Sequence, residues 1–247
     1  MQPSDVPVTE VLANLSIGYI VLAAFFLTLI RLALVPSKAP FAKSIAELVE
    51  SLIIAGVLVF LIIRPFFLQA FFIPSESMEP TLMGHKKGYN SGTGQSYDSD
   101  INDHIFVYKL GMRLGNPKPG EIIVFKAPKE ADASGNNVEN VLIKRLIAVG
   151  NDTVQMKTDA KGKYRIYRNG VVLDEPYINE EMQNIAPSGR SYAVDEVLRL
   201  APDELFVMGD NRNHSNDSRF WGPLKRDRVI GKAEFIFWPL SRLRLIR

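Results

Sequence analysis

The chain has 247 residues, a formal net charge of +2 at pH 7 and no cysteine. A nearly balanced charge argues against a nucleic-acid-binding surface, which needs a clear excess of lysine and arginine. The absence of cysteine excludes a disulfide framework, thiol catalysis and a cysteine-ligated metal.

The first long apolar run covers residues 16–36, SIGYIVLAAFFLTLIRLALVP, and Arg31 is its one charged residue. A helix needs about 20 mostly apolar residues to cross a bilayer. No basic region precedes this run, and Asp5 and Glu10 lie upstream of it, so the pattern is not that of a cleavable signal peptide. We predict a transmembrane helix over about 16–36.

A second apolar run, LIIAGVLVFLII at 52–63, is short for a span, but AELV at 46–49 lengthens it. We predict a second transmembrane helix over about 47–64, ending at Arg64, whose long side chain can extend to the interface. The alternative is a buried or interfacial helix, because the fully apolar core is short. Both helices belong to a predicted membrane anchor over residues 1–73.

Basic residues between the two apolar runs predict the orientation of the anchor. Arg31, Lys38 and Lys43 lie in or beside the short connection. Cytoplasmic loops carry an excess of lysine and arginine, so we expect this loop in the cytoplasm. The N-terminus and everything after residue 64 are then expected on the extracytoplasmic side of the cytoplasmic membrane.

From residue 74 onward the pattern changes to short β-rich runs separated by turn residues. Asn169-Gly170 between two apolar runs predicts a hairpin, because a type I′ turn needs two residues with positive φ. No helical pattern of comparable strength occurs, so residues 74–247 are predicted to form an all-β domain. The expected β-rich runs are 105–109, 121–128, 141–149, 152–158, 164–170, 171–175, 205–210 and 232–240.

Two serines follow the anchor in the stretch FFIPSESMEPTL, residues 71–82. If this stretch is a strand, Ser75 and Ser77 lie on one face, because side chains alternate with period two. One hydroxyl can then attack a substrate while the other donates a hydrogen bond. The alternative is a polar turn after a membrane segment.

A serine nucleophile needs a base, and Lys144 in VLIKRLIAV is a candidate. A solvated lysine has a pKa of about 10.4 and is a poor base at neutral pH, whereas burial lowers the pKa of the amine. The alternative is a solvated lysine on an edge strand, with Arg145 on the opposite face. His214 is a second candidate base. His85, His104 and His214 lie far apart, without the spacing of a metal site, and are predicted to be surface residues.

The stretch GDNRNHSNDSRFWG, residues 209–222, is rich in charged and hydroxyl side chains. It lacks the spacing and the closing glutamate of an EF-hand, so it is not predicted to bind calcium. Its positive and negative charges balance, which suits internal ion pairs that hold a loop rigid. The alternative is a solvated polar turn.

Taken together and in this order, four stretches resemble bacterial type I signal peptidases, the membrane-bound leader peptidases. The resemblance extends from about residue 50 to the C-terminus and includes the closing GKAEFIFWPLSRLRLI. The four stretches are IPSESMEPTL at 73–82, PGEIIVFKAP at 119–128, IKRLIAVGNDTV at 143–154 and GDNRNHSNDSRFWG at 209–222.

The resemblance implies a Ser-Lys dyad in which Ser77 is the nucleophile and Lys144 the general base. It implies that the Ser75 hydroxyl joins the Ser77 N–H in an oxyanion hole and that Ser215 orients Lys144. At 213 and 214 the family pattern often has an acidic residue and an asparagine, whereas this chain has Asn213 and His214.

Further residues are placed by the resemblance alone. Asp217 and Arg219 resemble a supporting pair close to the dyad, and Asp210 resembles a partner for Arg145. Residues 151–204 resemble a reduced second β subdomain inserted in the domain. The residues expected to line the substrate pocket are Ile73, Pro74, Met78, Leu82 and Ile143.

The activity implied is that of a membrane-bound serine endopeptidase, a hydrolase that removes signal peptides from exported preproteins after small residues. No metal or organic cofactor is expected, and the expected partners are signal peptides and the lipid bilayer. A nucleophile held at the membrane interface suits the aromatic residues Phe66, Phe67, Phe71 and Phe72. Two alternatives remain: a Ser-Lys peptidase of a narrower export pathway, and a membrane-anchored β module that binds peptides without cutting them.

Overall fold

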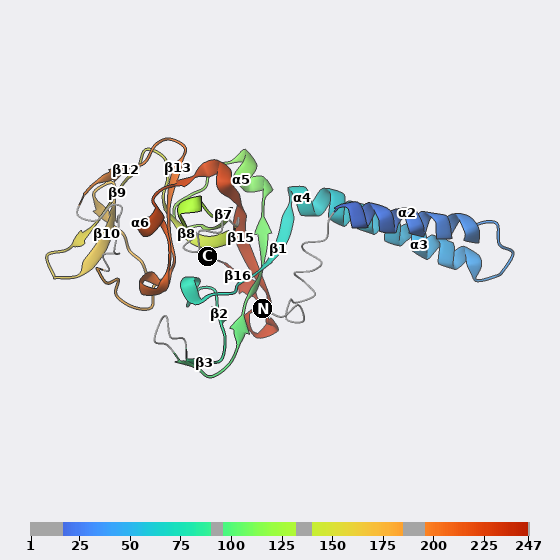
Figure 1. The fold of residues 1–247 in the computed structure, drawn as a ribbon, viewed down its shortest axis with the longest axis horizontal. Coiled ribbons are helices and arrows are strands. Elements are labelled where there is room, and N and C mark those ends of the chain that lie inside the picture. The colour runs from blue at the N-terminus through green and yellow to red at the C-terminus, as the bar shows by residue number, and fades with distance from the viewer. Residues whose placement is uncertain (1–16, 90–95, 132–139, 185–195, 247) are drawn as a thin grey trace. The chain divides into compact units, whose positions relative to one another are not determined.

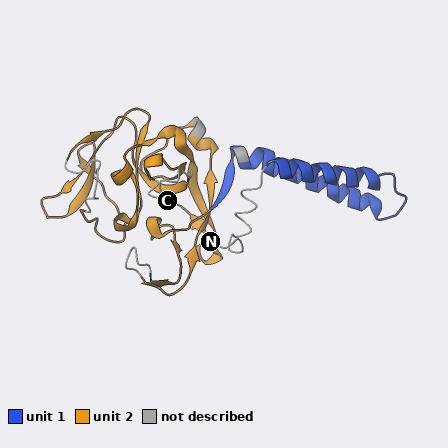
Figure 2. Ribbon diagram, in the orientation of Figure 1, with its two compact units in different colours: residues 1–71 blue, residues 72–247 orange. Residues whose placement is uncertain are grey.

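The computed structural model describes residues 17–89, 96–131, 140–184 and 196–246. The chain divides into two units, Met1–Phe71 and Phe72–Arg247 (Figure 2). Residues 1–16 of the predicted anchor and residues 185–195 of the predicted small subdomain lie outside the described residues.

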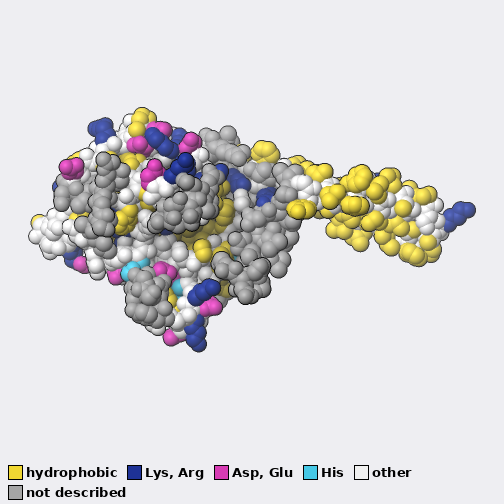
Figure 3. Space-filling model, in the orientation of Figure 1, with side chains coloured by type: hydrophobic (Ala, Val, Ile, Leu, Met, Phe, Trp, Pro, Cys, Tyr) yellow, Lys and Arg dark blue, Asp and Glu magenta, His cyan; other side chains and the backbone are white. Residues whose placement is uncertain are grey.

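The first unit contains two long helices joined by a short connection (Figure 1). Helix α2 spans Ile17–Leu34 and α3 spans Ala42–Val57. Arg31 of α2 and Glu50 of α3 form an ion pair with an N–O distance of 2.7 Å. Most other large side chains of these helices are apolar and exposed, and they gather over α2 and α3 in Figure 3.

Among the described residues, one helix is long and apolar enough to cross a membrane, Ala42–Ile63, with a mean hydropathy of 2.4. The helix Gly18–Leu34 is apolar but shorter. The prediction of spans at about 16–36 and 47–64 therefore located both helices, but the structure has one of spanning length. The second helix begins earlier than predicted because the residues before Glu47, such as Ala42 and Ala46, favour a helix.

A wider helical turn precedes the proline at the end of this helix. Leu58–Ile63 is a π-helix, and the Arg64 N–H donates to the carbonyl of Val59, five residues earlier. Pro65 has no N–H to donate, so a local change in the hydrogen-bond pattern is expected beside it. The chain then remains helical through α4, Arg64–Phe66, rather than ending at Arg64 as predicted.

The second unit is built mainly of β-structure, as predicted. Its large sheet has the order β6–β15–β7–β8–β13–β14, with β16 paired to β15, and these neighbours are antiparallel (Figure 1). The strands are β6 (His104–Tyr108), β7 (Ile122–Lys126), β8 (Val141–Ala148), β13 (Glu204–Met208), β14 (Leu224–Lys225), β15 (Val229–Trp238) and β16 (Arg244–Leu245).

Apolar residues of this sheet alternate between two buried clusters. Leu146 and Val207 belong to one cluster, and Ile147 and Phe206 to the other. Side chains alternate between the faces of a strand, so Lys144 shares a face with Leu146, and Arg145 shares one with Ile147. The central strands are therefore covered on both faces.

A second sheet has the order β11–β10–β9–β12 and falls within residues 151–204. Its strands are β9 (Thr153–Thr158), β10 (Tyr164–Arg168), β11 (Val171–Val172) and β12 (Leu198–Arg199). Asn169 and Gly170 have φ values of 53° and 79° between paired β10 and β11, which confirms the predicted hairpin. The strand predicted over 171–175 is shorter than expected, because Glu175 turns inward to pair with Arg212.

Short elements complete the chain. The remaining strands are β1 (Leu68–Phe72), β2 (Gly84–His85), β3 (Gly88–Tyr89), β4 (Ser96–Tyr97) and β5 (Ile101–Asn102). Short α-helices not predicted from the sequence are α5 (Leu110–Leu114) and α6 (Ser218–Trp221). Single 3₁₀ turns are η3 (Glu76–Met78), η4 (Lys129–Ala131), η5 (Arg212–His214), η6 (Arg226–Arg228) and η7 (Leu240–Arg242).

Candidate active site

The structure brings together the serine and the lysine that the sequence singled out. Ser77 lies in η3, and Lys144 lies in β8 between β7 and β13. The Lys144 Nζ donates a 2.6 Å hydrogen bond to the Ser77 Oγ, and the two residues are only 3% and 8% exposed. Because β8 is a central strand and Lys144 is buried, the alternative of a solvated edge-strand lysine is wrong.

Ser75 and Ser77 are not on one strand, which corrects that prediction. Ser75 is extended, with φ −138° and ψ 155°, whereas Ser77 belongs to a 3₁₀ turn. Their Oγ atoms are nevertheless 3.3 Å apart. As whole residues, Ser75 is exposed and Ser77 is buried.

Burial changes the acid–base behaviour of Lys144. It lowers the pKa of the amine from 10.5 to about 8, although the carboxylates of Asp217 and Asp210 oppose the change. Desolvation disfavours the ammonium form, which is the physical cause. With a pKa of about 8, roughly a tenth of the amine is neutral at pH 7.

An ion pair between Asp217 and Arg219 stabilises the loop that follows β13. The Asp217 carboxylate accepts hydrogen bonds from Arg219 Nε at 2.8 Å and from the Gly209 N–H at 3.0 Å. Burial alone would raise the pKa of Asp217, but Arg219 and these hydrogen bonds lower it, so the carboxylate is ionised. Arg219 also donates to the carbonyl of Arg212 at 2.6 Å, which ties the two ends of the loop together.

A second ion pair joins Arg145, the residue directly after Lys144, to Asp210 in the loop after β13. Arg145 donates to the Asp210 carboxylate through Nε at 2.8 Å and Nη2 at 2.7 Å. Thr81, four residues after Ser77, donates to the same carboxylate at 2.5 Å. The Arg145 guanidinium lies 4.0 Å from the ring centre of Tyr177, which was not predicted as a site residue. This cluster links β8, the loop after β13 and the segment that follows Ser77.

Ser215 is buried, and its Oγ has no hydrogen-bond partner within the described part of the chain. The hydroxyl lies near Asp217 and helps to lower the pKa of that carboxyl, but outside ordinary hydrogen-bond geometry. It packs against Gly209, where a Cβ would lie 2.3 Å from the Ser215 Oγ and 2.4 Å from the Ser77 carbonyl oxygen. Gly209 therefore permits the close approach of these two serines.

Sequence reasoning missed Gly209 and Asn211. The Asn211 N–H donates to the Ser77 carbonyl, and its side-chain Nδ2 donates to the Glu76 carbonyl, both at 3.2 Å. The only sequence signal was the position of these residues directly after a predicted strand. Which carbonyls they meet depends on a contact between segments more than 130 residues apart.

The five residues expected to line the substrate pocket differ in accessibility. Ile73 is 2% exposed, and Met78 and Leu82 are completely covered by protein. Pro74 is exposed and Ile143 is half-buried, so these two can meet a ligand directly.

The histidines do not join the dyad in the described structure. His214 is only partly buried, and its Nε2 lies 3.8 Å from the Glu180 Oε1, whereas the Lys144 Nζ bonds to Ser77. His85 is 6% exposed, so the prediction of a surface residue was wrong there. Among the described residues, no group of three His, Cys, Asp or Glu side chains could hold a metal ion.

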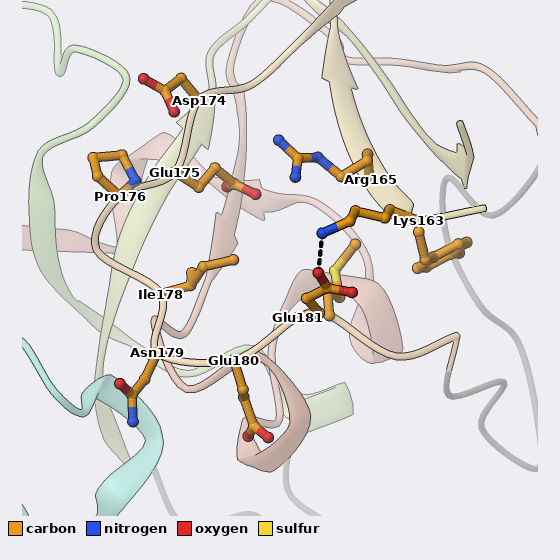
Figure 4. A pocket seen from close by; sticks show the side chains of 11 residues that line it. Lys163, Arg165, Asp174, Glu175, Pro176, Ile178, Asn179, Glu180 and Glu181 are labelled. Carbon is orange, nitrogen blue, oxygen red and sulfur yellow. Dashed lines mark hydrogen bonds and ion pairs between the residues drawn. The ribbon is translucent and has the colours of Figure 1, made fainter. Parts of the chain in front are cut away.

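A polar cavity lies beside β10 (Figure 4). Lys163 and Glu181 form an ion pair in it, and Arg165, Asp174 and Glu180 also line it. None of the predicted site residues lines this cavity. Its mixed charges do not suit the small apolar side chains expected in the substrate pocket.

Comparisons with known proteins agree in pointing to one family. The profile of a family described as signal peptidase, peptidase S26, matches residues 45–238. The chain is 35% identical over 184 residues to a probable signal peptidase I-2 of Synechocystis sp., covering 74% of this chain and 69% of that protein. It is 35% identical over 208 residues to a probable signal peptidase I-1 of the same organism, covering 84% and 88%. It is 32% identical over 232 residues to a signal peptidase I of Mycobacterium tuberculosis, covering 79% and 74%.

Proposed function

Because the chain belongs to the signal peptidase family, peptidase S26, we propose that Ser77 and Lys144 form its catalytic dyad. The protein is a hydrolase, a serine peptidase that cleaves signal peptides. The observation that carries the dyad assignment is the 2.6 Å hydrogen bond from the buried Lys144 Nζ to the Ser77 Oγ.

Neutral Lys144 takes the proton of the Ser77 hydroxyl as the Oγ attacks the carbonyl carbon of the scissile bond. The ammonium then gives that proton to the leaving amine, so the mature protein departs with a free N-terminus. An acyl-enzyme ester remains on Ser77. Lys144, neutral again, takes a proton from the water that attacks the ester. It then gives that proton to the Ser77 Oγ as the signal peptide leaves with a free carboxyl group, which restores both residues.

The Ser77 N–H and the Ser75 hydroxyl stabilise the oxyanion of each tetrahedral intermediate. The position of Ser75 supports this role, because the residue is exposed and its Oγ lies 3.3 Å from that of the nucleophile. A donor in this position acts on the charge that develops in the transition state, so it affects kcat more than substrate binding.

The remaining polar residues hold the dyad in place. Ser215 orients the Lys144 amine, and its otherwise unpartnered buried hydroxyl supports this assignment. The Asp217–Arg219 pair holds the loop that carries Ser215, and the Arg145–Asp210 pair joins that loop to β8. A network whose charges are all paired is rigid, which favours catalysis by a fixed dyad.

The peptide is cleaved after a small residue, with small side chains preferred at the first and third positions before the cut. Pro74 and Ile143 contact these side chains directly. Ile73, Met78 and Leu82 form the covered apolar layer behind them and limit the depth of the pocket.

The family is membrane-associated, and its substrates are signal peptides of preproteins. For this chain we infer a cytoplasmic-membrane protein with two spans, a cytoplasmic connection and an extracytoplasmic peptidase domain. The apolar helices Gly18–Leu34 and Ala42–Ile63 support the spans, and the basic residues Lys38 and Lys43 between them support the orientation. Phe66 and Phe67, which are 48% and 39% exposed, suit the membrane interface.

Incubation of the purified full-length protein with several preproteins, beside the Ser77→Ala variant, tests the proposal. We expect cleavage of most preproteins by the unaltered chain and of none by the variant. Cleavage restricted to one export class would indicate a narrower peptidase. Binding without cleavage by the unaltered chain would indicate a peptide-binding module and contradict the proposal.

A further inference from the structure

A buried polar cluster outside the dyad lies on the loop that follows Ser77. The Glu79 Oε1 lies 2.5 Å from the His85 Nδ1 and 3.2 Å from the Gly84 N–H. The His85 ring stacks on the Tyr97 ring with 3.7 Å between their centres and 13° between their planes. Glu79 and His85 side chains are 12% and 6% exposed, so the pair is largely removed from water.

Glu79 is the common acceptor of this cluster. An ionised carboxylate can only accept hydrogen bonds, and in that form Glu79 pairs with the His85 tautomer that carries its proton on Nδ1. The Tyr97 hydroxyl also bonds to Glu79, and burial together with the negative charges of Glu79 and Glu76 raises the pKa of Tyr97 to about 12. Tyr97 therefore remains a donor at any working pH, and three donors converge on one carboxylate.

Gly84 connects this cluster to Ser75. A Cβ on Gly84 would lie 2.3 Å from the Ser75 carbonyl oxygen and 2.7 Å from the Ser75 nitrogen. The backbones of Gly84 and Ser75 are thus in close contact. The hydrogen bond from the Gly84 N–H to the Glu79 carboxylate fixes the position of Gly84 in this contact. Asn102, the strand partner of Gly84 in the β2–β5 pair, donates to the Ile73 carbonyl at 2.9 Å. Gly84 and Asn102 thus hold the chain at Ile73 and Ser75 against the β2–β5 pair.

We propose that Glu79 and His85 are positioning residues of the peptidase, which hold Gly84 against Ser75 and so aim the Ser75 hydroxyl at the oxyanion. The inference rests on the proposed role of Ser75 in the oxyanion hole. A cluster with a merely structural role would change the stability of the protein without changing the turnover of folded enzyme. A positioning cluster lowers kcat in folded enzyme, and only when the Ser75 hydroxyl is present.

The test measures kcat and KM of the full-length protein in detergent with one short peptide substrate. We expect His85→Ala to lower kcat about tenfold with KM changed less than about twofold, because the affected donor acts on developing charge. His85→Asn should recover most of the loss, because its amide can donate from nearly the position of Nδ1. In a Ser75→Ala background, His85→Ala should lower kcat by less than about twofold, since coupled residues are not additive.

Asn169→Ala is the matched control, because Asn169 holds a hairpin of the small sheet through hydrogen bonds to Thr153 and Asp152. It should lower stability without changing kcat. If His85→Ala does not fold, Tyr97→Phe replaces it, since this change keeps the ring stack and removes one donor to Glu79. A smaller loss of kcat that again requires Ser75 is then expected.

The outcomes separate the two proposals. Equal losses of kcat from His85→Ala with and without Ser75, or no loss in folded His85→Ala, would overturn the positioning role and leave the oxyanion role of Ser75 intact. If Ser75→Ala alone leaves kcat unchanged, the oxyanion role itself is wrong, and the inference falls with it.

Discussion

Lys144 donates a hydrogen bond of 2.6 Å to Ser77, although 67 positions separate the two residues in the sequence. The contact forms because β8 is enclosed between β7 and β13, while the loop after β13 reaches back to the Ser77 carbonyl through Asn211. Strand β13 thus helps to bury Lys144, and the loop that follows the same strand holds Ser77.

Ser77→Ala and Lys144→Ala are each expected to reduce preprotein cleavage below detection while the circular dichroism spectrum stays unchanged. Neither residue has a substitute nearby, because Arg145 remains protonated and is paired with Asp210. Processing of a preprotein at more than a few per cent of the normal rate by either folded variant would refute the dyad.

Ser215→Ala is expected to lower kcat without abolishing activity, because the Lys144 amine loses a neighbour that fixes its direction. His214→Ala is the matched control from the same loop, and we expect it to be nearly silent, since His214 is partly exposed and lies toward Glu180. The two variants are compared in one peptide assay. The reverse result, with His214→Ala inactive, would identify His214 as the base.

The rate should depend on pH through Lys144. The neutral amine is the active form and its pKa is about 8, so kcat/KM should rise with pH through about 8 and level off above it. Removal of residues 1–64 should leave this midpoint nearly unchanged, because the groups that affect Lys144 belong to the second unit. The measurement is a pH–rate series on both forms with one short peptide. A midpoint near 10 in both would mean that Lys144 is solvated and that the proposed mechanism is wrong.

Lys144→Met should stabilise the folded domain at pH 7. The pKa of Lys144 is lower in the folded than in the unfolded state, so its buried charge costs stability below about pH 8. The cost decreases as pH rises from about 8 to 10.5, where the unfolded chain binds more protons than the folded one. The gain in unfolding free energy should be at most about 3 kcal/mol at pH 7 and should fade by pH 10. Denaturant unfolding of the domain at both pH values checks this, and an equal gain at both would contradict the cause given.

Gly209→Ala should reduce activity strongly, because the added Cβ would lie 2.4 Å from the Ser77 carbonyl oxygen, a backbone atom that cannot move without displacing the nucleophile. Gly56→Ala is a matched control, since a Cβ there has nothing within 4 Å. The rate of peptide cleavage by Gly209→Ala should be at least an order of magnitude lower than that by Gly56→Ala. Equal activities would show that the Ser77 loop adjusts without cost.

Local features of the sequence singled out Ser77 and Lys144 as candidates, and the resemblance of four ordered stretches to one family implied their pairing. Lys144 is recognisable as a charge within an apolar strand, and the Asn169-Gly170 hairpin follows from the φ values that its turn needs. The pairing of Ser75 with Ser77 was anticipated for the wrong reason, since a 3₁₀ turn rather than a strand brings their hydroxyls together.

What the sequence could not provide depends on contacts between distant segments. Tyr177 is a neighbour of Arg145, and Glu175, two residues earlier, pairs with Arg212. His85 looks like a surface residue in its polar stretch, and its burial depends on Tyr97 and Glu79. Periodicity and spacing do not predict such partners, because the contacts form only when distant segments come together in the fold.

The Arg31–Glu50 ion pair has a consequence for the order in which the proposed anchor is made. A ribosome completes Arg31 nineteen residues before Glu50, so the first helix emerges with an uncompensated cation. Arg31 lies in the last turn of its helix, and an unpaired charge near the end of a spanning helix is less favourable than a paired one. The first helix therefore gains its full stability in lipid only after the second has been synthesised, and the two should enter the membrane as a hairpin rather than one at a time.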